Sequence, residues 1–162
     1  MPLFHNEKYV VPMILILWIL TIIYDKPNRW KLVCLIPLAI ILADQSGLWI
    51  KKMVLRPRPF ITMNPETIYH LVPPSGAYLS FPSNHAANHA ALAIVFSSVY
   101  QHLRFIFWGL AITIMFSRVY IGVHYPMDVI SGCILGTVCG LILVKGWNYF
   151  NKETLLKTED SI

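Results

Sequence analysis

The chain has 162 residues, of which 56% are hydrophobic and only 13% are charged, and its mean hydropathy is +0.58. These values exclude an ordinary soluble domain and predict a protein embedded in a membrane. The three cysteines lie in apolar stretches, so they do not indicate the disulfide framework of a small secreted protein. The net charge of +5 is not gathered along one polar face, and a nucleic-acid partner is therefore not expected.

Apolar stretches predict an all-α, integral membrane helical bundle with about five transmembrane helices. The first stretch is followed by charged residues and not by a small-residue cleavage site, so we expect a retained helix and no signal peptide. The fourth is short and needs Arg104 and Arg118 at its ends to cross a bilayer. A single transmembrane domain over 1–162 is expected, with helices at about residues 9–24, 32–50, 86–103, 104–118 and 127–145.

A long segment, residues 51–81, separates the second predicted helix from the third. Its prolines and aromatic residues indicate an irregular cap at the lipid interface, in which His70 is expected to anchor the segment and not to contact substrate. Five crossings place the termini on opposite sides. A slight excess of basic residues, counted with the cluster after the second helix set aside, predicts a cytoplasmic tail at 146–162 in the cell (inner) membrane. The segment then faces the exterior or periplasm.

A basic cluster follows the second predicted helix. Lys51, Lys52, Arg56 and Arg58 lie within eight residues, and cations so close together require an anion. Basic residues at a helix end also anchor it to anionic headgroups. The cluster alone therefore indicates either a membrane anchor or a phosphate-binding site.

A second motif, Phe-Pro-Ser-Asn-His at residues 81–85, directly precedes the third predicted helix. Ser83 or Asn84 suits the N-cap, so that unpaired backbone N–H groups and the positive end of the helix point out of the membrane. Such a helix start suits a phosphate. An ordinary capped helix with an interfacial His85 is the alternative.

The third motif lies between the fourth and fifth predicted helices. Pro126 suits the first turn of a helix, which places His124 in the preceding loop and Asp128 in the first turn behind it. A carboxylate on one imidazole nitrogen fixes the tautomer and leaves the other nitrogen to act as base, ligand or nucleophile. A helix-capping Asp128 beside a hydrogen-bonded His124 is the structural alternative.

All three motifs are expected at the same membrane face. A charge at mid-membrane costs about 2.5 to 3.5 kcal/mol, so chance clustering explains them poorly. The combined pattern resembles the three-part signature of the type 2 phosphatidic acid phosphatase superfamily, which includes vanadium haloperoxidases. It reads Lys51-x6-Arg58-Pro59, then Pro-Ser-Asn-His at 82–85, then Ser117-Arg118-x5-His124-x3-Asp128.

Two features depart from that signature. Asn84 stands where the second motif usually has glycine, and many membrane members have six helices where this sequence predicts five. Asparagine is the non-glycine residue that best tolerates a left-handed backbone, which is compatible with a turn at this position.

The resemblance implies a metal-independent lipid phosphatase without a cofactor, similar to the compact bacterial phosphatidylglycerophosphatases, undecaprenyl pyrophosphatases and lipid A 1-phosphatases. It implies that His124 attacks phosphorus, that Asp128 stabilises the resulting imidazolium and that His85 is the general acid and base. One neutral and one protonated histidine predict a bell-shaped pH profile. The phosphate-binding residues would be Lys51, Arg58, Ser83, Asn84 and Arg118.

The expected partners are membrane lipids and a lipid-linked phosphate that enters sideways from the bilayer. Phosphatidylglycerophosphate, phosphatidate, undecaprenyl pyrophosphate and lipid A 1-phosphate are the candidate substrates, and the motifs do not select among them.

A metal-binding membrane protein is the main alternative function. His85 and His89 lie one helical turn apart, and His124 with Asp128 would complete a four-ligand site. Three cations beside a divalent ion would repel it, so we expect phosphate and no metal, with His89 lining the cleft. A vanadate binder and a catalytically lapsed interaction protein remain as further alternatives. Asp44, in the second apolar stretch, is expected to form a structural hydrogen bond.

Overall fold

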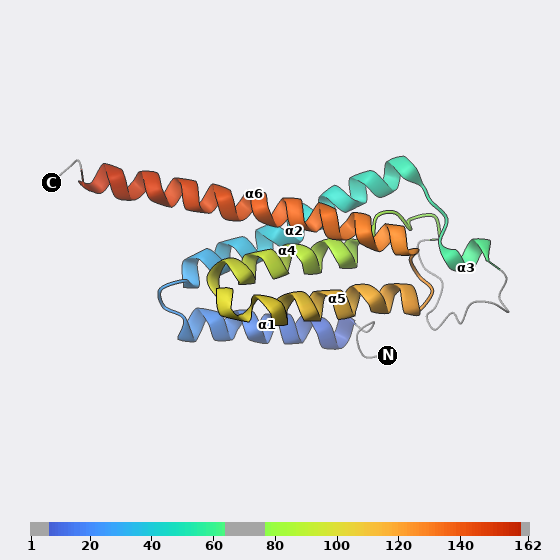
Figure 1. Ribbon diagram of the computed structural model, residues 1–162, viewed down its shortest axis with the longest axis horizontal. Helices are drawn as coiled ribbons and strands as arrows, with labels where there is room; N and C mark the ends of the chain where they lie inside the picture. The colour runs from blue at the N-terminus through green and yellow to red at the C-terminus, as the bar shows by residue number, and fades with distance from the viewer. Residues whose placement is uncertain (1–6, 64–76, 160–162) are drawn as a thin grey trace.

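The computed structural model describes residues 7–63 and 77–159, and all regular secondary structure within these ranges is helical. Figure 1 shows the long helices packed side by side, with successive long helices running in opposite directions. The elements are α1 (Glu7–Tyr24), α2 (Arg29–Val54), α3 (Pro59–Thr62), α4 (Asn84–Val99), the 3₁₀ helix η1 (Gln101–Leu103), α5 (Arg104–Tyr120) and α6 (Pro126–Glu159).

The helical membrane bundle predicted from the sequence is confirmed. Three segments of the described chain are long and apolar enough to cross a bilayer, namely Arg29–Thr62, Gln101–Tyr120 and Pro126–Lys152. The helix α4 has 16 residues, fewer than the ~20 that span a bilayer alone. It is enclosed by the other helices, and its partly buried and buried side chains face protein.

Several predicted boundaries were wrong. The helix α2 continues past residue 50 because its lysines are compatible with a helix, and it ends where Leu55 adopts a left-handed conformation with φ of 48°. The expected helix 86–103 begins at Asn84 and is interrupted at Tyr100, before η1. The expected tail 146–162 continues α6 to Glu159, because a polar sequence marks the membrane boundary but does not end a helix. Residues 64–76 of the predicted cap, with His70, lie outside the described residues, as do residues 160–162.

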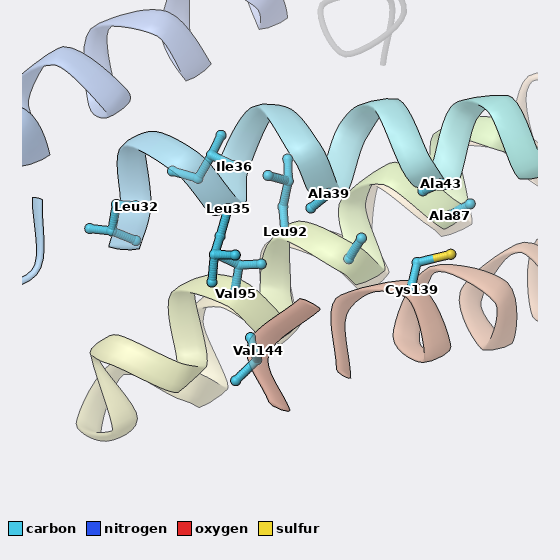
Figure 2. Packing of buried hydrophobic residues seen from close by; sticks show 11 residues of the cluster. Leu32, Leu35, Ile36, Ala39, Ala43, Ala87, Leu92, Val95, Cys139 and Val144 are labelled. Atoms are coloured by element: carbon cyan, nitrogen blue, oxygen red, sulfur yellow. The ribbon is translucent and has the colours of Figure 1, made fainter. Parts of the chain in front are cut away.

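The helix α4 is the centre of the packing. Its alanines are buried between α2, α5 and α6, and the leucines and valines of α2, α4 and α6 shown in Figure 2 form the larger apolar cluster. Small residues also allow α6 to approach α4 closely. A Cβ atom on Gly132 or Gly136 would collide with the backbone carbonyl of Ser83 or Ala87 respectively. Close approach through small residues is a common way for membrane helices to associate.

Candidate active site

The ends of four helices meet at one end of the bundle. Because successive long helices alternate in direction, the C-terminal ends of α2 and α5 lie beside the N-terminal ends of α4 and α6 (Figure 1). Each of the three sequence motifs lies at one of these ends. The fold therefore brings together segments that are far apart in the sequence.

Asp128, in the first turn of α6, is completely buried and has several hydrogen-bond partners. Its Oδ2 atom accepts hydrogen bonds from Ser80 Oγ at 2.6 Å and from the backbone N–H of Tyr125 at 3.0 Å. Its Oδ1 atom accepts one from Arg56 Nη1 at 2.7 Å. The backbone carbonyl of Asp128 accepts the N–H of Ser83 at 2.9 Å. A buried carboxylate requires such partners, and these fix its orientation.

His124 is buried in the loop between α5 and α6, where Gly122 turns the chain with a positive φ of 73°. Its Nδ1 atom lies 3.6 Å from Asp128 Oδ2, and apo catalytic pairs often have such long separations. Burial lowers the pKa of His124 below its usual value of 6.5; the nearby Asp128 carboxylate opposes this, and the charges of Arg58 and Lys51 lower it further. His124 is therefore mainly neutral at neutral pH.

Lys51 is buried at the end of α2, and its ammonium group points at backbone carbonyls. Nζ donates to the carbonyl oxygens of Leu79 at 2.8 Å and of Pro82 at 2.5 Å, and more weakly to the carbonyl oxygen of Ser80 at 3.5 Å. An ammonium group has three N–H donors, and three carbonyls of the segment before α4 accept them. Lys51 thus fixes this segment and contributes positive charge, while direct binding of phosphate by Lys51 remains a prediction.

The start of α4 follows the predicted capping arrangement. Ser83 is the N-cap, and its Oγ accepts the N–H of Ala86 at 3.4 Å. Asn84 is the first helical residue, and the described residues contain no left-handed asparagine, so this position does not need the backbone of a glycine. Its side chain turns toward α2, where Nδ2 donates to Asp44 Oδ1 at 2.8 Å and where it covers Gly47. The predicted structural hydrogen bond of Asp44 is confirmed.

The remaining predicted site residues lie at the same end of the bundle. His85 is half-buried in the first turn of α4, and Arg118 is 1% exposed in the last turn of α5. Arg58 is half-buried at the start of α3, and its backbone N–H bonds to the carbonyl of Ala77 at 2.8 Å. His85 and Arg118 thus come from neighbouring helices, since α4 packs against α5.

The alternative metal site finds no support in the side-chain positions. His89 Nδ1 lies 2.7 Å from the backbone carbonyl of His85, one turn before it on α4. Across the part of the chain that the structure describes, no three His, Cys, Asp or Glu side chains are grouped so that they could hold a metal ion. The two histidines, His124 and Asp128 therefore do not form the four-ligand site considered above.

Two residues that contact Asp128 have no role that the sequence pattern indicates. Arg56 is one charge of the basic cluster in the sequence, and Ser80 lies in the irregular segment. They are 72 and 48 residues away from Asp128 along the chain, so no local spacing indicates the contact. The one available signal was the need of a buried carboxylate for a cation and for hydrogen-bond donors.

The comparison with known families agrees with this arrangement. Residues 30–152 match the model of the PAP2 superfamily, a range that extends from the start of α2 into α6 and contains all three motifs. The chain belongs to the PAP2 superfamily. It is an integral membrane protein with helical spans.

Individual PAP2 proteins are similar over much of the chain. A lipid A 4′-phosphatase of Bacteroides thetaiotaomicron is 34% identical over 122 residues, covering 68% of this chain and 53% of the relative. The undecaprenyl-diphosphatase BcrC of Bacillus subtilis is 35% identical over 92 residues, covering 55% of this chain and 44% of the relative. The chain thus spans about half the length of these curated relatives.

A solved PAP2 structure has the same fold. The crystal structure of a transmembrane PAP2 type phosphatidylglycerolphosphate phosphatase from Bacillus subtilis superposes with a TM-score of 0.67 at 28% identity. The match covers 91% of this chain and 74% of that one. The arrangement of helices around the motifs is therefore that of a PAP2 membrane protein.

Proposed function

We propose that this protein is a metal-independent phosphatase that hydrolyses a lipid phosphate or pyrophosphate in the membrane. The observation that carries this proposal is the buried pair of His124 and Asp128 at an end of the bundle where Lys51, Arg58 and Arg118 also lie. A neutral imidazole oriented by a carboxylate is a nucleophile, and neighbouring cations stabilise the charge of a phosphoryl group.

In the proposed first step, His124 Nε2 attacks phosphorus, because Nδ1 faces Asp128. The new N–P bond forms as the bond from phosphorus to the leaving oxygen breaks, and His85 donates a proton to that oxygen. Arg58 and Arg118 bind the phosphoryl oxygens as bidentate donors, with Ser83 and the N–H groups at the start of α4. Asp128 stabilises the imidazolium form that results.

In the second step, His85 takes a proton from water, the water oxygen bonds to phosphorus and the N–P bond breaks. Inorganic phosphate leaves and His124 is neutral again. The same chemistry applies to a phosphate monoester and to a pyrophosphate, since only the leaving group differs. This agrees with the names of the relatives, which include phosphatases of lipid A and of an undecaprenyl diphosphate.

The substrate class follows from the position of the site in a membrane helix bundle. We propose phosphatidylglycerophosphate, phosphatidate, undecaprenyl pyrophosphate or a phosphate of lipid A, reached from the outer leaflet, with the active site toward the exterior or periplasm. A panel of these four lipids in mixed micelles, with inorganic phosphate as the product measured, distinguishes among them.

The decisive test compares the wild-type protein with two histidine variants. His124→Ala removes the proposed nucleophile and should lower phosphate release at least about 10⁴-fold. His102→Ala is the matched control, because His102 is exposed on η1 and distant in the fold from the site. Wild-type activity should persist in EDTA and be inhibited by vanadate. Full turnover in His124→Ala, or loss of activity in EDTA, would contradict the proposal.

A further inference from the structure

The two carboxylate oxygens of Asp128 have different neighbours. Oδ2 faces His124 at 3.6 Å and accepts hydrogen bonds from Ser80 and the backbone of Tyr125. Oδ1 accepts the 2.7 Å hydrogen bond of Arg56. The carboxylate is completely buried, whereas the Arg56 side chain is 36% exposed. Arg56 therefore contacts the carboxylate oxygen that does not face the histidine.

Arg56 is held by more than its ion pair. Its guanidinium group lies over the ring of Tyr125, with the Cζ atom 4.2 Å from the ring centroid. The Tyr125 hydroxyl lies 2.6 Å from Thr62 Oγ1, on α3. The backbone carbonyl of Arg56 accepts the N–H of Ser80 at 3.0 Å, and Ser80 itself donates to Asp128. Ion pairing, stacking on an aromatic ring and backbone pairing fix the guanidinium in one position.

We propose that Arg56 is a positioning residue that holds Asp128 in place and limits how strongly Asp128 stabilises the imidazolium form of His124. This inference rests on the proposed function of the His124 site. Arg56 is not one of the motif residues to which the family resemblance assigns a role, so the inference adds a residue to the proposed site. The connection between α2 and α3 would then set the reactivity of a histidine that precedes α6.

The electrostatic argument follows from the shared carboxylate. With Arg56 present, the charge of Asp128 is partly neutralised and attracts a proton on His124 less strongly. Without Arg56, the carboxylate charge acts on His124 alone, which raises the pKa of His124 and leaves more of it protonated. The carboxylate also loses a charged hydrogen-bond donor that fixes its orientation. Both changes reduce the fraction of His124 that is ready to attack.

Lys51, another cation near His124 and Asp128, has different hydrogen-bond partners from Arg56. Lys51 donates to three backbone carbonyls, whereas Arg56 donates to the Asp128 carboxylate itself. The charged or titratable groups at this end include Asp44, Lys51, Lys52, Arg56 and Arg58 around α2 and α3, His85 and His89 on α4, Arg118 on α5, and Tyr125 and Asp128 at α6. Because Arg56 contacts the carboxylate directly, its removal acts on His124 through Asp128.

The test compares Arg56→Gln and Arg56→Lys with Lys52→Gln in the full-length protein in detergent. Lys52 is exposed in the same basic cluster, so its substitution removes the same charge without touching Asp128. Phosphate release from p-nitrophenyl phosphate and from phosphatidylglycerophosphate is measured from about pH 4.5 to 8.5. In parallel, His124 is titrated by NMR with labelled histidine, and its signal is assigned by its absence from His124→Gln.

Arg56→Gln should lower kcat about tenfold with little change in KM. The acidic limb of its pH profile and the NMR pKa of His124 should both move to higher pH. Arg56→Lys restores the charge and should return the acidic limb toward that of wild type. Lys52→Gln should leave kcat, KM and the His124 titration unchanged.

Two results would overturn the inference. An increase in KM at unchanged kcat would assign Arg56 to substrate binding. A lower yield of folded Arg56→Gln protein with an unshifted His124 titration would assign it a structural role alone. Absence of phosphate release by the wild-type protein from every lipid tested would instead contradict the proposed function, and the NMR titration would still decide the role of Arg56.

Discussion

At the scale of single residues, His124 combines burial with a carboxylate on one side and cations nearby. Sequence reasoning placed His124 and Asp128 correctly relative to each other, because proline and a spacing of four residues restrict a helix start strongly. It did not indicate Arg56, whose contact with Asp128 depends on how α2 and α6 pack. The direction of the Asn84 side chain, toward Asp44, could not be predicted either, because it depends on the space left by Gly47 on another helix.

The lowered pKa of His124 predicts a pH dependence. In the proposed mechanism, His124 must be neutral to attack phosphorus, so activity should rise with pH as His124 loses its proton. Because burial and the nearby cations lower its pKa, the acidic limb of kcat/KM should lie below the usual histidine value of 6.5. Initial rates with p-nitrophenyl phosphate across the acidic range check this. An acidic limb above that value would mean that Asp128 dominates the electrostatics of the site.

At the scale of helices, the contact between α4 and α6 determines where the site residues lie. Apolar stretches predicted the existence of both helices, since about 20 such residues indicate a membrane segment. Their close approach depends on Gly132, Gly136 and Gly140, which face carbonyls or side chains of α4. Without a view of the partner helix, these glycines cannot be distinguished from Gly146, which faces open space. Which helices pack against each other could therefore not be predicted from the sequence pattern.

Substitution of Gly136 tests this contact. Gly136→Val introduces a side chain where a Cβ atom alone would collide with the Ala87 backbone, so the helices must separate. Overpacking of this kind costs about 1 to 3 kcal/mol or more, and the thermal unfolding temperature in detergent should fall together with phosphate release.

Gly146→Ala is the matched control on the same helix, because no atom of another helix lies within 4 Å of its added Cβ. It should leave stability unchanged or raise it by about 0.5 to 1 kcal/mol, since alanine favours a helix. Equal stability of Gly136→Val and Gly146→Ala would show that α4 and α6 are not in close contact in the membrane.

At the scale of the whole molecule, the alternation of helices places the start of α1 and the end of α6 at opposite ends of the bundle (Figure 1). The end opposite the site has its own polar contact, in which Tyr100 Oη donates to Asp25 Oδ2 at 2.6 Å. This hydrogen bond lowers the pKa of Asp25, and burial together with Asp25 raises the pKa of Tyr100 to about 12.

The class of fold was predictable because composition alone requires a membrane bundle, whereas the predicted orientation in the membrane rests on a small excess of basic residues.

Cysteine labelling tests that orientation. In a background where Cys34, Cys133 and Cys139 are replaced, Met63→Cys and Asn151→Cys introduce exposed thiols at opposite ends of the bundle. An impermeant maleimide should label Met63→Cys in intact cells and Asn151→Cys only after lysis. The reverse pattern would place the active site in the cytoplasm.

The contact of α6 glycines with α4 carbonyls also has a consequence for how substrate preference can differ among PAP2 proteins. The helix capped by Ser83 and the helix that follows His124 pack so closely that no side chain fits between them at Gly132 and Gly136. Headgroup preference can then change through the surrounding helices and connections while the spacing between the proposed phosphate-binding groups and the proposed nucleophile stays constant. Evolution of new specificities would require no rebuilding of this inner pair.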